Sequence, residues 1–473
     1  MKKIIKTSLI VVALMISAAA SAQQNLRTAY FLDGYTYNYK LNPAFAPERA
    51  FFAFPVLGNV GIGIETNLGL STFIYPTQEG KLTTFLNSSV SDEEFLSKIN
   101  NLNKTNVSVN ETLMAVGFRV GKSFHTLDVS LKSEINSVVP KGLYAFMKTG
   151  SSNGQYSWDI SNMGARANAR LEFAYGYQRS FGDNLRIGAR LKLLAGIAQA
   201  NLLVDNLNLT MSDTQWTVKA HGTAEISGPV RVGTIEGTNE LNFEYMETPE
   251  SMFEWVEFFS SPSIGAAVDF GASYDFLDYF TASVSVLDLG YISWKGTTSA
   301  AMKGGEWTFD GFENLGSDDG SVDEQLSQLG DDLLKMLKME RTADFITKKS
   351  MLSATVHAGL EARMPFYERL TFGLLGTHRI DGPYSWTEGR LSANLAPVNW
   401  FSLAGSYAYS DFGNSVGAAV NIHLPGLNLY AGLDSFLPFK DVTPQYVPIN
   451  ALNTNITFGL TFTFGKAVGR YRK

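Results

Sequence analysis

The chain has 473 residues, a formal net charge of -7, charged residues at 18% and no cysteine. The lack of cysteine excludes disulfides, thiolate metal sites and a lipid-modified N-terminal cysteine. The acidic balance argues against a nucleic-acid partner.

The N-terminus has the pattern of a secretory signal peptide. Lys2, Lys3 and Lys6 precede an apolar run over residues 9–16, and small residues follow up to Ala22. This pattern predicts Sec-type export with cleavage near Ala22, which makes residues 1–22 the signal peptide. No other window approaches the roughly 20 apolar residues of a membrane-spanning helix.

Residues 23–57 follow the signal peptide and do not alternate as a strand does. They contain Pro43, Pro47 and Pro55 among many aromatic residues, and proline is poorly tolerated in a paired ladder. We expect a plug or hatch segment at the mouth of a barrel. A loosely draped N-terminal arm is the alternative interpretation.

The rest of the chain alternates apolar and polar residues, which is typical of strands with two different faces. We predict an all-β, transmembrane antiparallel barrel of about 14 strands over residues 58–465, with residues 466–473 as a basic C-terminal tail. The expected strands cover residues 60–68, 112–120, 126–134, 166–179, 185–193, 264–274, 280–289, 352–364, 370–375, 390–395, 400–409, 416–424, 427–433 and 455–465.

The connections support closure into a barrel in a membrane. Those after the even-numbered strands are tight, and the long ones all follow odd-numbered strands, as expected for periplasmic turns and extracellular loops. The strand at 455–465 has a purely apolar face opposite a small, polar one. Asp288 is the clear exception on the face assigned to lipid. The alternative is a secreted soluble β protein whose apolar face is its core.

One long loop carries a different periodicity. In residues 321–345, Ser321 and Glu324 have the spacing of a capping box, and leucines recur at helical spacing. We expect a short amphipathic helix in this extracellular loop.

The inward face of the second to fifth strands collects basic residues, whereas we expect mostly small residues on the later strands. The basic residues are Arg119, Lys132, Arg166, Arg170, Arg186, Arg190 and Lys192, against Asp128, Glu134 and Glu172. Such a wall attracts an anionic head group such as a carboxylate. Alternatively, it pairs with acidic residues of the plug, such as Asp33 and Glu48.

Residues that could support catalysis or bind a metal are scattered. The five histidines, none at a metal-ligand spacing, are His125, His221, His357, His378 and His423. We expect His357 and His423 to face the lumen. We therefore predict no enzymatic activity, no metal and no cofactor.

Several short pieces resemble the outer-membrane barrels similar to the long-chain fatty acid transporter, and more closely an uncharacterised fourteen-strand subgroup. The pieces are Asn42-Pro43-Ala44, residues 288–294, Asn399-Trp400-Phe401 and residues 455–465. The resemblance implies an N-terminal hatch in the lumen, with Asn42 and Pro43 among its contacts. In the best-known members it implies lateral passage of hydrophobic compounds, although similar barrels also anchor proteins in secretion systems.

Two functions follow as expectations for this bacterial outer-membrane protein. The first is passive uptake of a small hydrophobic or amphipathic solute past the plug, which predicts an apolar pocket near that segment. The alternative is a non-transporting barrel that anchors or assembles partner proteins at the cell surface, which predicts a filled lumen and exposed apolar loop patches. The expected partners are outer-membrane lipid, a hydrophobic small molecule, and surface or periplasmic proteins.

Overall fold

The computed structural model describes residues 25–54, 58–76, 82–150, 156–212, 215–247, 262–309, 338–436 and 453–468. The signal peptide and most of the helix expected at 321–345 lie outside the described residues. Residues 339–345 of that expected helix belong to the strand β16 (Met339–Met351), so the helix prediction is wrong at that end. None of the described helices is long and apolar enough to cross a membrane.

Fourteen strand positions close into an antiparallel barrel, which confirms the predicted fold class. Each strand pairs with the next, and β23 pairs back with β2. In order around the barrel the strands are β2 (Asn59–Thr66), β5 (Leu102–Val120), β6 (Ser123–Pro140), β8 (Met163–Phe181), β9 (Leu185–Met211), β13 (Ser263–Phe276), β14 (Phe280–Met302), β17 (Ala354–Met364), β18 (Tyr367–Ile380), β19 (Trp386–Val398), β20 (Phe401–Ser410), β21 (Gly413–Leu424), β22 (Leu427–Phe436) and β23 (Thr454–Phe464).

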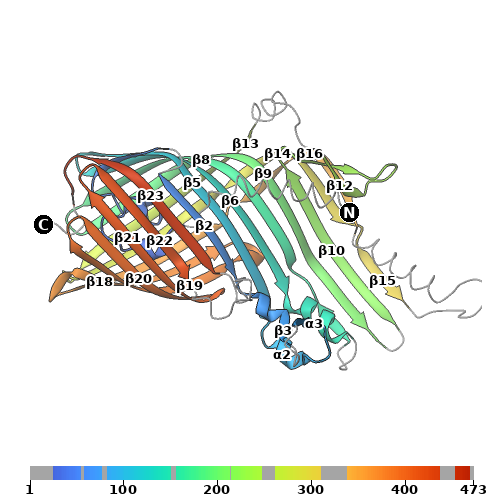
Figure 1. Cartoon of the computed structure of the whole chain (residues 1–473). Coiled ribbons are helices and arrows are strands. Elements are labelled where there is room, and N and C mark those ends of the chain that lie inside the picture. The colour runs from blue at the N-terminus through green and yellow to red at the C-terminus, as the bar shows by residue number, and fades with distance from the viewer. Residues whose placement is uncertain are drawn as a thin grey trace, which may run out of the picture.

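The two ends of the barrel differ. At one end the strands are joined by tight turns, for example at Gly182 between β8 and β9 and at Gly426 between β21 and β22, both with positive φ. At the other end β9 and β14 continue past the barrel wall as a flared sheet (Figure 1). By the usual asymmetry of such barrels, the tight turns face the periplasm and the flared sheet faces outward.

The flared sheet and its loops form an outer layer. β9 and β14 pair there with β10 (Trp216–Ser227), and β7 (Ser157–Asp159), β15 (Gly305–Phe309) and β16 extend the same sheet. The remaining elements of this layer are η3 (Leu70–Thr72), β3 (Ile74–Pro76), β4 (Leu82–Thr84), α2 (Asp92–Leu96), α3 (Lys141–Thr149), β11 (Arg231–Thr234), β12 (Leu241–Glu247) and η4 (Gly382–Tyr384). Figure 1 shows α2, α3 and β3 grouped together beside the barrel end.

The two faces of the wall have opposite character. In β9, Leu191 and Leu193 are 61% and 66% exposed on the outside, whereas Lys192 between them is 3% exposed on the inside. Because successive side chains of a strand point to opposite faces, one alternating sequence supplies both an apolar exterior and a polar lumen. A closed barrel leaves no unpaired edge strand, which allows it to span a membrane. The apolar exterior is then the face in contact with lipid.

The N-terminal segment, defined here as residues 25–49, passes through the inside of the barrel. It contains η1 (Arg27–Ala29) and η2 (Thr36–Lys40), whose residues are all buried. Its aromatic side chains pack in one apolar cluster with wall residues such as Phe124 and Tyr430. The wall begins earlier than the expected residue 58, because β1 (Ala50–Ala53) already pairs with β5 and β23.

Asp288 does not face lipid, and the prediction that placed it there is wrong. Asp288 has a φ of 57°, and the pairing of β13 with β14 shifts register between Val268 and Phe270, opposite this residue. A bulge of this kind reverses the face on which the following side chains lie. The Asp288 carboxylate therefore lies in the lumen, 2.6 Å from Nζ of Lys192.

Candidate lumenal binding site

A pair of glycines forms a slot that receives the N-terminal segment. Gly188 of β9 and Gly271 of β13 lie directly opposite each other on the lumenal face. A Cβ atom on Gly188 would lie 1.9 Å from the carbonyl oxygen of Pro43, and one on Gly271 would lie 2.1 Å from Oδ1 of Asn42. Neither distance is physically possible, so the close approach of Asn42 and Pro43 requires glycine at both wall positions.

Asn42 satisfies its polar groups within this slot. Its Nδ2 donates to the hydroxyl of Tyr30 at 3.1 Å and to the carbonyl of Val284 at 3.2 Å, while its Oδ1 accepts from the backbone N–H of Ala44 at 2.9 Å. Asn42 is fully buried. A buried amide with its hydrogen bonds made fixes both its own segment and the wall strands around it.

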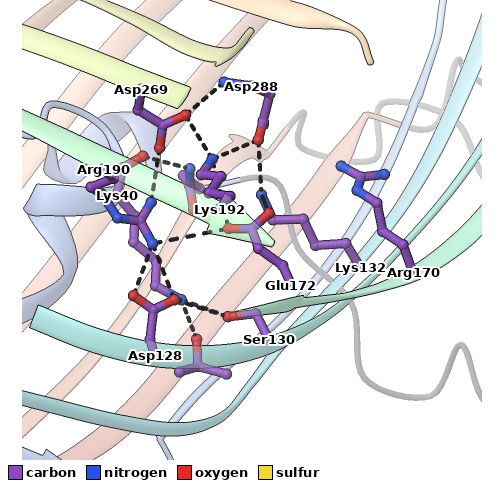
Figure 2. Close-up of polar contacts among 12 residues, drawn as sticks. Lys40, Asp128, Ser130, Lys132, Arg170, Glu172, Arg190, Lys192, Asp269 and Asp288 are labelled. Carbon is purple, nitrogen blue, oxygen red and sulfur yellow. Dashed lines mark hydrogen bonds and ion pairs between the residues drawn. The ribbon is translucent and has the colours of Figure 1, made fainter. Parts of the chain in front are cut away.

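A lumenal charge cluster of four basic and four acidic residues lies beside the slot. Figure 2 shows how these side chains point toward one another. Its members are Lys40, Asp128, Lys132, Glu172, Arg190, Lys192, Asp269 and Asp288. Arg190 bridges two carboxylates, with Nη2 at 2.8 Å from Asp128 and Nη1 at 3.0 Å from Asp269. Lys192 lies 2.7 Å from Asp269. The equal numbers of opposite charges compensate one another at a buried site.

The N-terminal segment supplies one member of this cluster. Nζ of Lys40 lies 3.3 Å from Asp128 and donates to the hydroxyls of Thr112 and Ser130 at 2.7 and 2.9 Å. Lys40 therefore ties the segment to β5 and β6.

A second cluster, the Arg27 cluster, anchors the other end of the segment. It consists of Arg27, Glu65, Glu388, Arg390 and Asp434. Arg27 lies 2.6 Å from Glu65 and 3.3 Å from Glu388. The Asp434 carboxylate accepts hydrogen bonds from the backbone N–H groups of Arg27 and Thr28 at 2.8 and 2.6 Å. This carboxylate thus satisfies N–H groups at the start of η1, where a helical turn leaves them unpaired.

The predicted site residues fall into three places. Asn42, Pro43, Arg190 and Lys192 meet around the slot and the lumenal charge cluster. Arg170 lies near that cluster, with Nη1 donating to Asn168 at 2.7 Å and Nη2 3.6 Å from Glu134.

The other two predicted arginines lie apart from the slot. Arg166 pairs with Asp381 beside η4, towards the outer end of the barrel. Arg186 lies 2.5 Å from Asp275, next to the tight turns. The structure therefore does not bring all five predicted basic residues together.

The expectation of a lopsided, basic wall is wrong. Carboxylates from β13, β14 and the loops neutralise the basic strands, and Glu388, Arg390 and Asp434 place charges on later strands that were expected to carry mostly small residues. For Glu48, one of the two acidic residues suggested to pair with the basic wall, the described ion pair is with a histidine. Glu48 lies 3.4 Å from Nδ1 of His423, which faces the lumen as predicted, as does the buried His357.

Sequence reasoning missed Lys40, Asp269 and the Arg27 cluster. Asp269 lies on the inward face of β13, the sixth strand of the wall. Including this strand when the charged inward-facing residues were collected would have found it. Asp288 and Asp434 lie at register shifts in β14 and β22. The local sequence does not predict a bulge of this kind, because the residues on each side of it still alternate between apolar and polar.

The N-terminal segment separates two cavities inside the barrel. The outer one, about 70 Å³, is lined by Arg27, Leu41, Asp288 and His357 among others. The inner one, about 410 Å³, lies at the tight-turn end below Phe31 and Leu32. A third hollow of about 830 Å³ is apolar and lies on the exterior of the wall, lined by side chains such as Phe173, Leu191 and Leu289.

Within the described ranges, no group of three or more histidine or acidic side chains is placed to hold a metal ion. Carboxylates that pair with lysine and arginine, as those of the lumenal charge cluster do, already have their charge compensated.

The closed wall of fourteen strands, its apolar exterior and its polar lumen define the class of an outer-membrane β-barrel protein. Within that class, the chain belongs to a family of unknown function, DUF5723, whose model matches residues 43–434. No curated protein sequence matches the chain.

Solved structures to which the chain is similar include two toluene transporters and a FadL homologue. The toluene transporter TodX of P. putida has 11% identity and a TM-score of 0.38, with 92% of this chain and 95% of that chain covered. The toluene transporter TbuX of Ralstonia pickettii has 9% identity and a TM-score of 0.40, with 91% and 93% covered. A Pseudomonas aeruginosa FadL homologue has 12% identity and a TM-score of 0.35, with 94% and 99% covered.

Proposed function

We propose that this barrel passively admits a small hydrophobic or amphipathic solute across the outer membrane, with residues 25–49 acting as the plug. The observation that carries the proposal is the position of this segment between the outer and inner cavities. A solute that enters from outside must displace the segment or leave through the side of the wall. The apolar hollow on the exterior is a place where such a solute would meet lipid.

The proposed role of the clusters is to hold the plug. Lys40 and Arg27 each form ion pairs with wall carboxylates at buried positions, and breaking a buried pair costs several kcal/mol. Asn42 and Pro43 fill the glycine slot. We assign Arg190 and Lys192 to organising the wall carboxylates around the plug, and we assign no catalytic role to any residue.

The proposal also includes the route to the membrane. The chain is exported with its signal peptide, which is cleaved near Ala22, and residues 25–49 thread the lumen as the barrel closes. The barrel, which we expect over residues 58–465, then forms the wall together with β1.

The second candidate function is anchoring of partner proteins at the cell surface. The observation that favours it is the outer layer, in which the sheet continues past the wall and carries α2 and α3. Leu82, Leu86 and Met147 of this layer are exposed. Exposed apolar side chains on a loop layer are typical of a protein-binding surface when they are contiguous.

The test compares the mature chain with a variant that lacks residues 25–49 but keeps β1. Single-channel conductance in planar bilayers reports whether the lumen opens. Uptake of the apolar fluorescent probe N-phenyl-1-naphthylamine by cells expressing each form reports solute entry. We expect conductance from the truncated form only, and faster probe uptake with the mature chain than without it. If the folded truncated form does not conduct and the mature chain leaves probe uptake unchanged, the anchoring function replaces uptake.

A further inference from the structure

The cavity at the tight-turn end has the size and lining of a ligand site. Its volume of about 410 Å³ falls within the roughly 300 to 1,000 Å³ typical of small-molecule pockets. Phe31 and Leu32 of the N-terminal segment form its roof, and Val398 and Trp400 supply apolar wall. Trp400 is 48% exposed, so the cavity includes residues at the rim of the barrel.

Three buried polar atoms line this cavity without a hydrogen-bond partner among the described residues. They are Oγ1 of Thr371, Oδ1 of Asn394 and Nε2 of His423. These side chains belong to residues that are 7%, 4% and 8% exposed. Thr371 and Asn394 are directly paired across β18 and β19. An unpaired buried polar atom is destabilising, so three in one cavity indicate a place for hydrogen bonds to a bound molecule.

The chemistry of these atoms selects the ligand. The amide nitrogen of Asn394 already donates to Ser392 at 3.3 Å, which leaves its carbonyl oxygen as an acceptor. Nε2 of His423 is the third unpaired atom, and Nδ1 of the same ring lies 3.4 Å from a Glu48 carboxylate oxygen. The Thr371 hydroxyl accepts as well as donates. The cavity therefore offers acceptors and requires donors from its ligand.

The charged residues around the cavity favour the same ligand. Four carboxylates line it, from Asp33, Glu48, Glu361 and Glu368, against three guanidinium groups, from Arg49, Arg363 and Arg369. This balance does not attract an anion. A neutral or cationic head group that carries O–H or N–H bonds fits better.

We propose that this inner cavity is a periplasm-facing binding site for a small amphipathic molecule with an apolar body and an O–H or N–H donating head group. The apolar body lies against Phe31 and Trp400, the head-group O–H or N–H donates to Oδ1 of Asn394, and the Thr371 hydroxyl hydrogen-bonds the heteroatom of the same head group. The site lies below the N-terminal segment and does not depend on that segment moving. It therefore goes beyond the proposed uptake function and stands if the barrel transports nothing.

The test uses two probes of nearly equal size and the mature chain in lipid nanodiscs. 4-Ethylphenol carries the donor, and 4-ethylanisole, its methyl ether, lacks it. Binding is measured by isothermal titration calorimetry, with empty nanodiscs subtracted to remove partition into lipid. We expect 4-ethylphenol to bind at least about tenfold more tightly than the ether, since a lost buried hydrogen bond of about 1.4 kcal/mol is tenfold in Kd.

Two variants locate the site. Thr371→Val and Asn394→Leu remove the unpaired oxygens, and we expect each to weaken 4-ethylphenol binding by about tenfold. The matched control is Thr457→Val, because Thr457 is also a buried lumenal threonine with an unpaired Oγ1 but does not line this cavity. Heat-modifiable migration on gels shows which variants have folded.

Three outcomes would overturn the proposal. The first is no saturable binding of 4-ethylphenol to the unmodified chain. The second is equal affinity for the phenol and the ether, which would mean that the donor is not recognised. The third is loss of binding in the Thr457 variant as large as that in folded Thr371→Val. The probe comparison needs no substitution, so the proposal stays testable even if a variant fails to fold.

Discussion

Gly188 and Gly271 face each other across β9 and β13, and together they leave the space that Asn42 and Pro43 occupy. Because a valine at position 188 would overlap the Pro43 carbonyl, Gly188→Val should force the N-terminal segment out of its slot. We expect the variant to fold as a barrel and to conduct ions in planar bilayers more than the mature chain does. The matched control is Gly405→Val, since Gly405 is exposed on the outside with no atom within 4 Å of a Cβ. A closed Gly188→Val barrel would mean that the slot does not position the segment.

Arg190 and Arg186 are four residues apart on β9 but have different surroundings. Arg190 is 3% exposed and compensates Asp128 and Asp269, so Arg190→Ala leaves two buried carboxylates short of a partner. We expect the free energy of unfolding to fall by about 3–5 kcal/mol. Arg186→Ala should change it by at most about 1 kcal/mol, since the Asp275 side chain is 29% exposed and retains solvent. Urea unfolding in detergent or liposomes measures both, and equal losses would contradict the difference in burial.

Removal of the N-terminal segment should make the lumen attract cations. The lumenal charge cluster then has three basic residues against four acidic ones, and the Arg27 cluster has one against three, because Lys40 and Arg27 are gone. We expect the chain without residues 25–49 to form a cation-selective channel. The reversal potential in a KCl gradient measures this selectivity. An anion-selective channel would restore the basic-wall interpretation of the sequence.

The exterior of β9 offers a direct test of which face meets lipid. Leu191 lies six residues after Leu185 at the start of β9, about the middle of the roughly 9 to 11 residues that cross a bilayer. Leu191→Arg should cost about 2–4 kcal/mol and lower the yield of folding into liposomes. The control is Phe366→Arg, because Phe366 is 81% exposed in the turn between β17 and β18. Equal yields from both variants would contradict a lipid-facing position for Leu191.

The alternating pattern was sufficient to predict the barrel. All fourteen predicted strands overlap the fourteen wall strands, although the structure extends several of them, such as β9 to Met211 and β14 to Met302. The pattern works because a two-residue period and tight turns are local properties of the chain. The extensions were missed because they continue into the outer sheet, where neither face meets lipid and the alternation weakens.

The interior of the barrel could be predicted only in part. The sequence indicated that Arg190, Lys192 and Asn42 belong to the lumen. Strand parity and an N-terminus inserted into the barrel are enough to place all three there. The partners of these residues needed the tertiary structure. The path of the N-terminal segment through the lumen brings Lys40 to Asp128. It also brings Arg27 to Glu388 and Asp434, which are more distant in the sequence.

The sequence by itself determined the class of fold, the direction in which most side chains point and the order of the strands around the wall. It did so because each strand carries its own period and each turn joins neighbours. Only the tertiary structure decided that Asp288 faces the lumen and that the wall carries balanced charge around the segment. The physical reason is that a bulge changes the face of a residue without changing the local composition, and an ion pair depends on distances across a lumen that no short stretch of sequence encodes.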